Sequence, residues 1–332
     1  MTALERALAA PKNLSHEELA AFLANDDEGL WREVFAAARE LKRRLGKDVV
    51  LPRGLIECSN ICAKDCLYCG IRKSNAKAVR YRLDEETVAA CIDEARRRGY
   101  PAVAFQAGET ESEANTAYYE RLVAYAARHV RPLEVTLSLG EQAEEVYRRW
   151  KEAGAMRYLI RIETSNRELY AKIHPAACSF ERRLGCIRTL KRLGYVTGSG
   201  VMIGLPGQTV EDLARDIVFY GEEDLDMVGM GPYVPNGETP LGKCEKCDGF
   251  EKFEMSLKMI ALTRLYLHDV NIVAATALEA LDPQGGRNRG IEAGANVVMP
   301  VLTPEKYRRC YDLYPGKAGA LSSKLESTGE AR

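Results

Sequence analysis

Long apolar stretches are missing from this sequence, and no run is long enough to span a bilayer. Residues 1–19 alternate charged residues with alanine and lack the apolar core of a signal peptide. Histidine is scarce, with four residues, and the formal net charge is only −1. A balanced charge gives no electrostatic reason to bind nucleic acid or an acidic membrane. We therefore expect a cytoplasmic protein whose partners include neither nucleic acid nor a membrane.

Cysteine, in contrast, is plentiful: the chain has ten. In a cytosolic chain of 332 residues, cysteines indicate metal binding or reduced buried thiols rather than disulfides. Cys62, Cys66 and Cys69 follow the spacing C-x3-C-x2-C. Three thiolates placed this closely can hold three irons of a cubane 4Fe-4S cluster, which leaves the fourth iron open for a ligand. Such a cluster is oxygen-sensitive, so we expect an anaerobic setting.

A zinc site is the alternative for this cysteine loop. Zinc needs a fourth Cys or His ligand nearby, and none of the four histidines lies close to the loop in sequence. Cys58 is close, but it belongs to a predicted strand end outside the loop. A second pair, Cys244 and Cys247, forms C-x2-C in a charged loop. Two thiolates alone complete neither a cluster nor a zinc site, so an accessory metal role for this pair is left open.

The apolar pattern predicts a complete (βα)8 barrel of the TIM type over residues 51–317. A helical extension is expected over residues 1–50, with a capping box from Ser15 to Glu18 and an apolar face of Leu30, Val34, Ala37 and Leu41. Residues 318–332 are expected to form a flexible tail. Eight short apolar runs alternate with amphipathic stretches, several of which end at a glycine (Gly99, Gly154, Gly194). The runs are Gly54–Cys58, Ala102–Gln106, Leu133–Leu139, Arg157–Glu163, Thr197–Gly204, Met227–Pro232, Asn271–Thr276 and Asn296–Leu302; the amphipathic stretches include Asp84–Gly99, Tyr118–His129, Glu141–Gly154, Phe180–Gly194 and Val210–Glu223.

A doubly wound open sheet is the alternative fold. The first predicted strand is followed by the cysteine loop rather than by a glycine-rich phosphate loop, which disfavours a dinucleotide-binding fold.

The active site of a parallel barrel forms at the C-terminal ends of its strands, so the polar residues that close each apolar run are the candidates. Alternation places Thr136 and Ser138 on one inward face, where they could bind a ligand or each other. Arg161 and Glu163 share an inward face in the same way. A buried Arg and Glu must either pair with each other or engage a ligand.

Several motifs resemble those of the radical S-adenosylmethionine (SAM) superfamily. The cysteine loop matches C-x3-C-x-aromatic-C, with Tyr68 as the aromatic residue. The stretch Gln106-Ala107-Gly108-Glu109 resembles the Gly-Gly-Glu motif, with alanine at the first glycine. By this resemblance, Glu109 would meet the SAM ammonium group, because a carboxylate stabilises a ligand cation.

Across residues 50–317 the chain is similar to a particular family, that of the FeFe-hydrogenase maturase HydE. The similarity recurs in Ile56–Arg72, Tyr81-Arg82, TLSLGE, KEAGAMRYLIRIET, GLPGQT, DMVGMGP and ANVVMP. It implies reductive cleavage of SAM to a 5′-deoxyadenosyl radical, and synthesis of the dithiomethylamine bridge from a cysteine-bound iron dicarbonyl cyanide complex. It also implies the maturases HydG and HydF, and a one-electron reductant, as partners. The implied SAM-binding residues are Tyr68, Glu109, Ser138, Glu163 and Arg183, and the implied substrate-cavity residues are Gln106, Thr136, Arg161, Met227, Thr276 and Tyr307.

The sequence departs from the family in three places. Some members bind a second cluster through C-terminal cysteines, but no cysteine follows Lys317 here. Ile162 and Ala275 stand where some relatives have His and Thr. These differences affect the expected shape of the cavity rather than the core chemistry.

Other functions compatible with the same motifs are a methylornithine-synthase-like mutase and a non-catalytic iron–sulfur carrier or scaffold. Biotin synthase needs a second cluster inside the barrel, and the predicted strands lack a cysteine set for it. A carrier has no need for the SAM ammonium site at Glu109.

Overall fold

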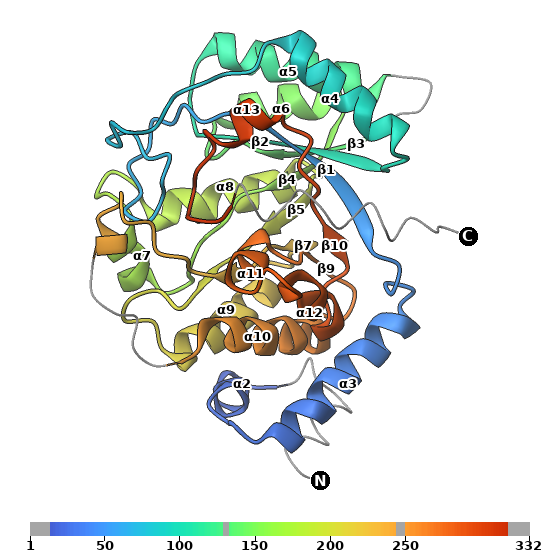
Figure 1. The fold of residues 1–332 in the computed structure, drawn as a ribbon, viewed down its shortest axis with the longest axis vertical. Coiled ribbons are helices and arrows are strands. Elements are labelled where there is room, and N and C mark those ends of the chain that lie inside the picture. Colours follow the sequence, from blue (N-terminus) through green and yellow to red (C-terminus); the bar gives the residue numbers. More distant parts are fainter. Residues whose placement is uncertain (1–13, 129–132, 244–249, 318–332) are drawn as a thin grey trace.

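The computed structural model describes residues 14–128, 133–243 and 250–317. In these ranges, eight parallel strands form a sheet that closes into a barrel (Figure 1). Asn296 N donates to Ile272 O and Ala274 N to Val297 O, both at 2.9 Å, which joins the last two strands. The prediction of a complete (βα)8 barrel is confirmed. The strands, in order around the barrel, are β10 (Val297–Val298), β1 (Leu51–Ser59), β2 (Ala102–Ala107), β3 (Glu134–Ser138), β4 (Ala155–Leu159), β5 (Val196–Ser199), β7 (Met227–Val228) and β9 (Asn271–Ile272).

Helices lie on the outside of this barrel, and capping side chains fix where they begin. The Asp84, Ser112, Ser179 and Thr209 side chains each accept a hydrogen bond from the first turn of the following helix. Gly99, Gly154 and Gly194 have positive φ at helix C-termini, as predicted. The helices are α4 (Glu85–Arg97), α5 (Glu113–Ala127), α6 (Glu144–Ala153), α7 (Arg167–Ile173), α8 (Phe180–Arg192), α9 (Val210–Glu222), α10 (Lys252–Leu267), α11 (Thr276–Leu281), α12 (Gly286–Ala293) and α13 (Glu305–Arg308), with a 3-10 turn η2 (Leu241–Lys243).

Two further helices precede the barrel, α2 (His16–Leu23) and α3 (Glu28–Arg44). The capping box of Ser15 and Glu18 is present. The prediction for α3 is right for Val34, but the other buried residues of this helix are Trp31, Ala38 and Lys42, each one position after a predicted residue. The predicted residues Leu30, Ala37 and Leu41 are only partly buried. α2 packs on α9, and α3 packs on α10 and α12. Residues 1–13, the pair Cys244 and Cys247, and the predicted tail 318–332 lie outside the described residues.

The strands after β3 are shorter than predicted. β4 ends at Leu159 rather than Glu163. The predicted runs Thr197–Gly204 and Met227–Pro232 are each divided, and their second halves pair with each other as β6 (Met202–Ile203) and β8 (Gly231–Pro232). The break falls at Gly200 and Gly229, where a Cβ on Gly200 would collide with the Gly229 carbonyl. The backbones approach closely at these two glycines, and the chain beyond them forms the mouth of the barrel.

Two helices also differ from the amphipathic pattern. α5 begins at Glu113, five residues before the predicted start, because Ser112 caps it. α10 is surrounded by α3, α9 and α12, and it buries apolar residues around most of its circumference. A helix buried on most sides carries no polar stripe, so its sequence lacks the usual helical period. Among the helices of the described ranges, none combines the length and apolar character needed to cross a bilayer.

Candidate active site

A cavity of about 340 Å³ lies where the strands end at their C-terminal side. This volume falls in the range of about 300–1,000 Å³ that is common for small-molecule sites. The cavity brings together residues from β1 to the segment after α13 that are far apart in sequence. The predicted site residues that line it are Cys62, Cys66, Tyr68, Cys69, Gln106, Glu109, Thr136, Ser138, Arg161, Glu163, Arg183 and Thr276.

Met227 and Tyr307 are not part of this lining. Met227 lies buried on β7, and its sulfur is 3.1 Å from a guanidinium nitrogen of Arg53 on β1. Tyr307 belongs to α13 and packs on Tyr81, with ring centroids 5.1 Å apart. The prediction that both residues contact the cavity must be corrected. Neither the two-residue strand β7 nor the position of α13 could be inferred from the apolar pattern.

The cysteine loop follows β1 and is held by hydrogen bonds to its backbone. Ala63 N donates to Glu109 O at 2.7 Å, and Lys73 N donates to Lys64 O at 2.8 Å. The Arg80 guanidinium donates to the Asn60, Ile71 and Arg72 carbonyls at 2.6–2.8 Å. A Cβ on Gly108 would collide with the Ile61 carbonyl, so glycine is required where this loop crosses the end of β2. Arg80 was not singled out from the sequence, because its partners are carbonyl groups that carry no residue signature.

The three loop cysteines are partly buried free thiols. Burial raises the pKa of each thiol, that of Cys69 to about 12. Protons therefore stay on these thiols until metal binding replaces them. In the described part of the chain, no three His, Cys, Asp or Glu side chains converge on the position of a single metal ion. A cubane cluster places each thiolate on a different iron, and Cys62, Cys66 and Cys69 open into one cavity, so this set of three thiols fits a 4Fe-4S cluster.

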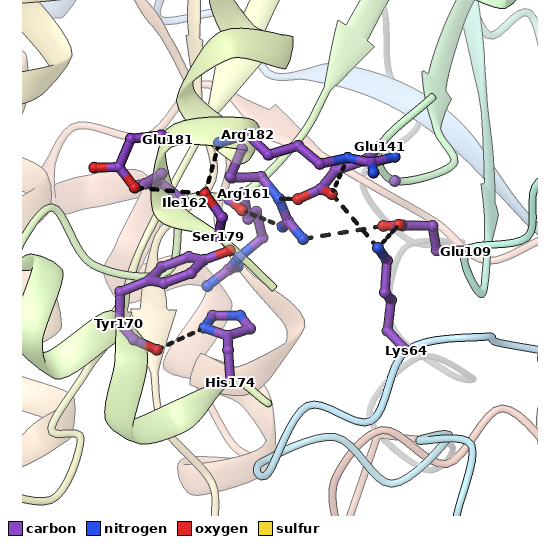
Figure 2. Close-up of polar contacts among 12 residues, drawn as sticks. Lys64, Glu109, Glu141, Arg161, Ile162, Tyr170, His174, Ser179, Glu181 and Arg182 are labelled. Carbon is purple, nitrogen blue, oxygen red and sulfur yellow. Dashed lines mark hydrogen bonds and ion pairs between the residues drawn. The ribbon is translucent and has the colours of Figure 1, made fainter. Parts of the chain in front are cut away.

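In the same cavity wall as the cysteines, Lys64, Glu109 and Arg183 form a network with the side chains of Glu141 and Arg182. Figure 2 shows the Glu109 and Glu141 carboxylates beside Lys64 and Arg182. Glu109 lies 2.9 Å from the Lys64 ammonium, and Glu141 lies 3.5 Å from the same group. Glu141 also accepts from Arg183 at 2.6 Å and pairs with Arg182 at 3.1 Å. Lys64 and Glu141 were not predicted as site residues, because the network joins three segments that are distant in sequence.

The two carboxylates of this network differ in how far nearby cations offset the effect of burial on their pKa values. Burial raises the pKa of Glu109, and the nearby Arg183 and Lys64 offset only part of that effect. Burial alone would also raise the pKa of Glu141, but Arg183, Lys64 and Arg182 bring it below its ordinary value. Nearby cations therefore outweigh the effect of burial on Glu141 but only partly offset it on Glu109. Of the two carboxylates, Glu109 is the one that would gain from a further cation.

Gly140 fixes the position of Glu109. Its φ is +77°, and any Cβ there would collide with the Glu109 carboxylate. The Gly140 carbonyl accepts hydrogen bonds from the buried hydroxyls of Tyr158 at 2.9 Å and Tyr147 at 3.3 Å. Tyr158 of β4 and Tyr147 of α6 therefore hold the turn that carries Glu141 against Glu109.

Arg161 and Glu163 form the mutual ion pair that was one of the two predicted alternatives, at 2.9 Å. Both still line the cavity, and Arg161 also donates to the Val201 carbonyl at 2.8 Å. Glu163 has φ of +67°, a conformation that is strained for a residue with a side chain. The fully buried Asp216 on α9 supports this turn, because one of its oxygens accepts from both Ser165 N and Ser165 Oγ at 2.6 Å.

Tyr68 is oriented by a residue that sequence reasoning missed. Its hydroxyl lies 3.2 Å from His174 Nε2, and His174 Nδ1 lies 3.0 Å from the Tyr170 carbonyl. A carbonyl can only accept, so Nδ1 carries the proton and Nε2 accepts from Tyr68. Burial, with the nearby Arg183, lowers the pKa of His174 to about 4, which keeps the ring neutral.

The C-terminal part of the barrel covers one side of the cavity. Leu313, Tyr314 and Lys317 are among its lining residues. Lys317 forms a buried ion pair with Glu57 of β1, and the Tyr314 hydroxyl lies 2.5 Å from Thr276 Oγ1. Neither contact could be predicted from the sequence, because each joins two segments that are distant along the chain.

The cavity fits SAM as well as the cluster. It offers Glu109 for an ammonium group and the Arg183 guanidinium for a carboxylate. The buried Thr136 hydroxyl has no hydrogen-bond partner within the described structure, so it is available to a ligand.

Comparisons with known proteins agree with this site. Residues 56–219 match the family model of the radical SAM superfamily. The chain is 44% identical over 308 residues to the FeFe-hydrogenase maturase subunit HydE of Thermotoga maritima, covering 92% of this chain and 85% of that protein. It is 26% identical over 294 residues to the 3-methylornithine synthase of Methanosarcina acetivorans, covering 87% and 80% of the two chains.

Solved structures show the same fold. A crystal structure of methylornithine synthase superposes with a TM-score of 0.79 at 22% identity, over 100% of this chain and 92% of the other. The maturase HydG from Carboxydothermus hydrogenoformans superposes with a TM-score of 0.77 at 23% identity, over 89% and 69%. The level and extent of the identity to HydE, together with the cysteine loop that opens into the cavity, establish the family. The chain is a radical SAM enzyme, with a 4Fe-4S cluster and SAM as cofactors, and it belongs to the HydE family of FeFe-hydrogenase maturases.

Proposed function

We propose that this enzyme acts on a cysteine-bound iron dicarbonyl cyanide complex during assembly of the hydrogenase dithiomethylamine bridge. The observation that carries the proposal is that the three cysteines and a set of polar strand-end residues line one cavity. Its wall supplies the Arg161 guanidinium, the hydroxyls of Thr136 and Thr276, and the Gln106 amide. These groups suit a small anionic substrate with several hydrogen-bond acceptors.

SAM takes the part of the cavity next to the cysteines in this proposal. Glu109 binds its ammonium group, because this carboxylate is the less compensated of the two. Arg183 binds the SAM carboxylate while Glu141 fixes the direction of the guanidinium. Tyr68, Ser138 and Glu163 complete the contacts. The cofactors, when bound, supply reductive cleavage of SAM to methionine and a 5′-deoxyadenosyl radical.

The protein itself contributes to the chemistry by enclosing the cavity in which the radical reacts. A primary alkyl radical reacts with whatever it meets, so water and other side reactants must be kept away. The Lys317–Glu57 ion pair and the Thr276–Tyr314 contact hold the C-terminal segment against the cavity. We assign this segment the role of excluding side reactants.

HydG, as the supplier of the substrate, HydF and a one-electron reductant are the proposed partners. The eight cysteines in the described ranges are free thiols. Free thiols persist in reducing compartments, and this supports a cytoplasmic location under anaerobic conditions.

The test is anaerobic reconstitution followed by reduction in the presence of SAM, with 5′-deoxyadenosine measured by mass spectrometry. We expect turnover to rise sharply when the iron–cysteine complex made by HydG is added. Stimulation by lysine instead would favour a methylornithine-type reaction. A reducible, cluster-replete protein that cleaves no SAM would refute an enzymatic role and favour an iron–sulfur carrier.

A further inference from the structure

Positive charge is concentrated around the cysteine loop. The whole chain has a net charge of −1. Residues 59–82 contain six Lys or Arg and a single carboxylate, Asp65, for a net charge of +5. Residues 304–310 contain three cations and one carboxylate, for a net charge of +2. The rest of the chain therefore carries −8, so the charge is strongly segregated.

These two segments are adjacent in the fold. The Asn60 side-chain nitrogen donates to both the Val79 and Cys310 carbonyls at 2.7 Å. Tyr81 packs on Tyr307 with centroids 5.1 Å apart. The two basic segments thus form one continuous surface at the end of β1, which we call the basic rim (residues 59–82 and 304–310).

Much of the charge on the basic rim faces solvent. The Lys77 side chain is 75% exposed, and Lys73 and Lys306 are exposed as well. Lys77 pairs with Glu238 at 2.8 Å, but an exposed ion pair of this kind is weak and exchanges readily. The rim also exposes two large apolar side chains, Ile61 at 43% and Val79 at 68%.

We propose that the basic rim is the docking surface for a small acidic electron-carrier protein. Ile61 directly precedes Cys62, so a protein seated on this residue lies against the cysteine loop. Complementary charge speeds and orients a transient encounter, and an apolar contact at the centre excludes water. Weak redox complexes are held by small interfaces, which the rim can supply.

The inference rests on the proposed function in one respect, namely that SAM cleavage consumes an electron. The carrier is oxidised by one electron, and reductive cleavage of one SAM molecule takes up that electron. The balance needs no proton, leaving group or further oxidant from the carrier.

Nucleic acid is the other polyanion that a basic surface could bind. Phosphate binding needs many cations spread along a track, whereas Arg72 pairs with Asp65 and the Arg80 guanidinium already donates to backbone carbonyls. The apolar pair beside the cysteine loop also favours a folded partner.

The test is the double variant Lys73→Glu/Lys77→Glu. Its matched control is Arg32→Glu/Arg39→Glu, which makes the same charge change at two exposed positions of α3. The probe is an acidic ferredoxin with two 4Fe-4S clusters, and dithionite serves as a small reductant that needs no docking. Calorimetric titration of the cluster-replete enzyme with oxidised ferredoxin, at low and moderate salt, reports binding without turnover.

We expect the rim variant to weaken ferredoxin binding by roughly tenfold or more, to flatten its salt dependence, and to raise the KM for ferredoxin in SAM cleavage. Its dithionite-driven rate should stay within about twofold of wild type, and the control should match wild type throughout.

Equal losses in the rim variant and the control would overturn the proposal, because they would reflect net charge alone. A fall in the dithionite-driven rate would also overturn it, by giving the rim a role in folding or cluster assembly. If duplex DNA at equal charge concentration displaces ferredoxin, the rim binds polyanions in general, and the proposal of a specific carrier protein is wrong. If no reductant supports SAM cleavage, the proposed function fails, while the titration still decides the docking surface.

Discussion

Both ends of the barrel bury cations, but the groups that bind these cations differ between the two ends. At the base, Arg264 donates to the carbonyls of Gly294, His268 and Val270 and to Asn296 Oδ1, at 2.6–3.0 Å. Lys42 likewise donates to the Ile291 carbonyl at 2.7 Å. At the mouth, Lys64 and Arg183 instead face the carboxylates of Glu109 and Glu141.

This difference separates structure from function. Backbone carbonyls are fixed by the fold, so Arg264 and Lys42 act as crosslinks between the segments whose carbonyls they bind. Carboxylates and ammonium groups that line a cavity can exchange partners with a charged ligand. Changes at the mouth should therefore alter ligand binding, and changes at the base should alter stability.

Removal of a cysteine ligand should have the largest effect on activity. In Cys69→Ala we expect SAM cleavage to fall by more than about 100-fold, because even residues that only support a metal ligand are worth 10–100-fold in affinity. Iron content and the cluster absorbance measure the loss. Cys91→Ala is the matched control, since Cys91 is a buried thiol of α4 whose sulfur contacts the Leu302 carbonyl. Full iron binding by Cys69→Ala would contradict the assignment.

A substitution at the base of the barrel should lower stability and leave activity unchanged. Arg264→Met leaves several buried carbonyls without a donor, and we expect it to lower the free energy of unfolding by about 3–5 kcal/mol. Denaturant unfolding measures this change, while SAM cleavage per folded molecule should be unchanged. A variant with wild-type stability would show that the crosslink at the base is dispensable.

The contrast between the ends also explains what the sequence could predict. Strand-end positions follow from alternation, so Thr136 and Ser138 were correctly placed on one face toward the cavity. Capping glycines such as Gly154 follow from local backbone geometry. Both signals act over a few residues, within the range that a sequence pattern can report.

Contacts across the barrel carry no such local signal. Lys64 meets Glu141, and Glu57 meets Lys317, only because the barrel closes. β5 and β7 end early because the backbones meet at Gly200 and Gly229, which depends on the neighbouring strand rather than on the run itself. For the same reason, the depth of Met227 in the barrel could not be inferred.

At the mouth, Glu109→Gln should weaken SAM binding by roughly 10- to 100-fold, since a hydrogen bond to a charged group contributes about 1.5–3 kcal/mol. The amide keeps the shape but loses the charge that faces the Lys64 ammonium. Calorimetric titration of the cluster-replete protein with SAM measures the change. Glu111→Gln, at an exposed carboxylate paired with Arg182, is the control and should bind SAM as wild type does. Equal affinities in all three proteins would remove Glu109 from the SAM site.

The smallest expected effect is a pH dependence at Asp216, behind the mouth. Burial raises its pKa from 3.8 to about 7, against the hydrogen bonds from Ser165 that favour the charged form. The folded state therefore holds this proton more tightly than the unfolded state does. The resulting stability is full below about pH 4 and is lost as the pH rises through about 7.

Asp216→Asn mimics the protonated acid and keeps an oxygen that can accept from Ser165. The variant should therefore gain stability relative to wild type as the pH rises from 5 to 8, because unfolding releases a proton from wild type but not from the variant. Thermal unfolding across this range measures the difference, and the subtraction cancels groups that titrate in both proteins. Parallel Tm curves would mean that Asp216 is already ionised at pH 5. The turn that carries Glu163 would then be held by a charged rather than a neutral acid.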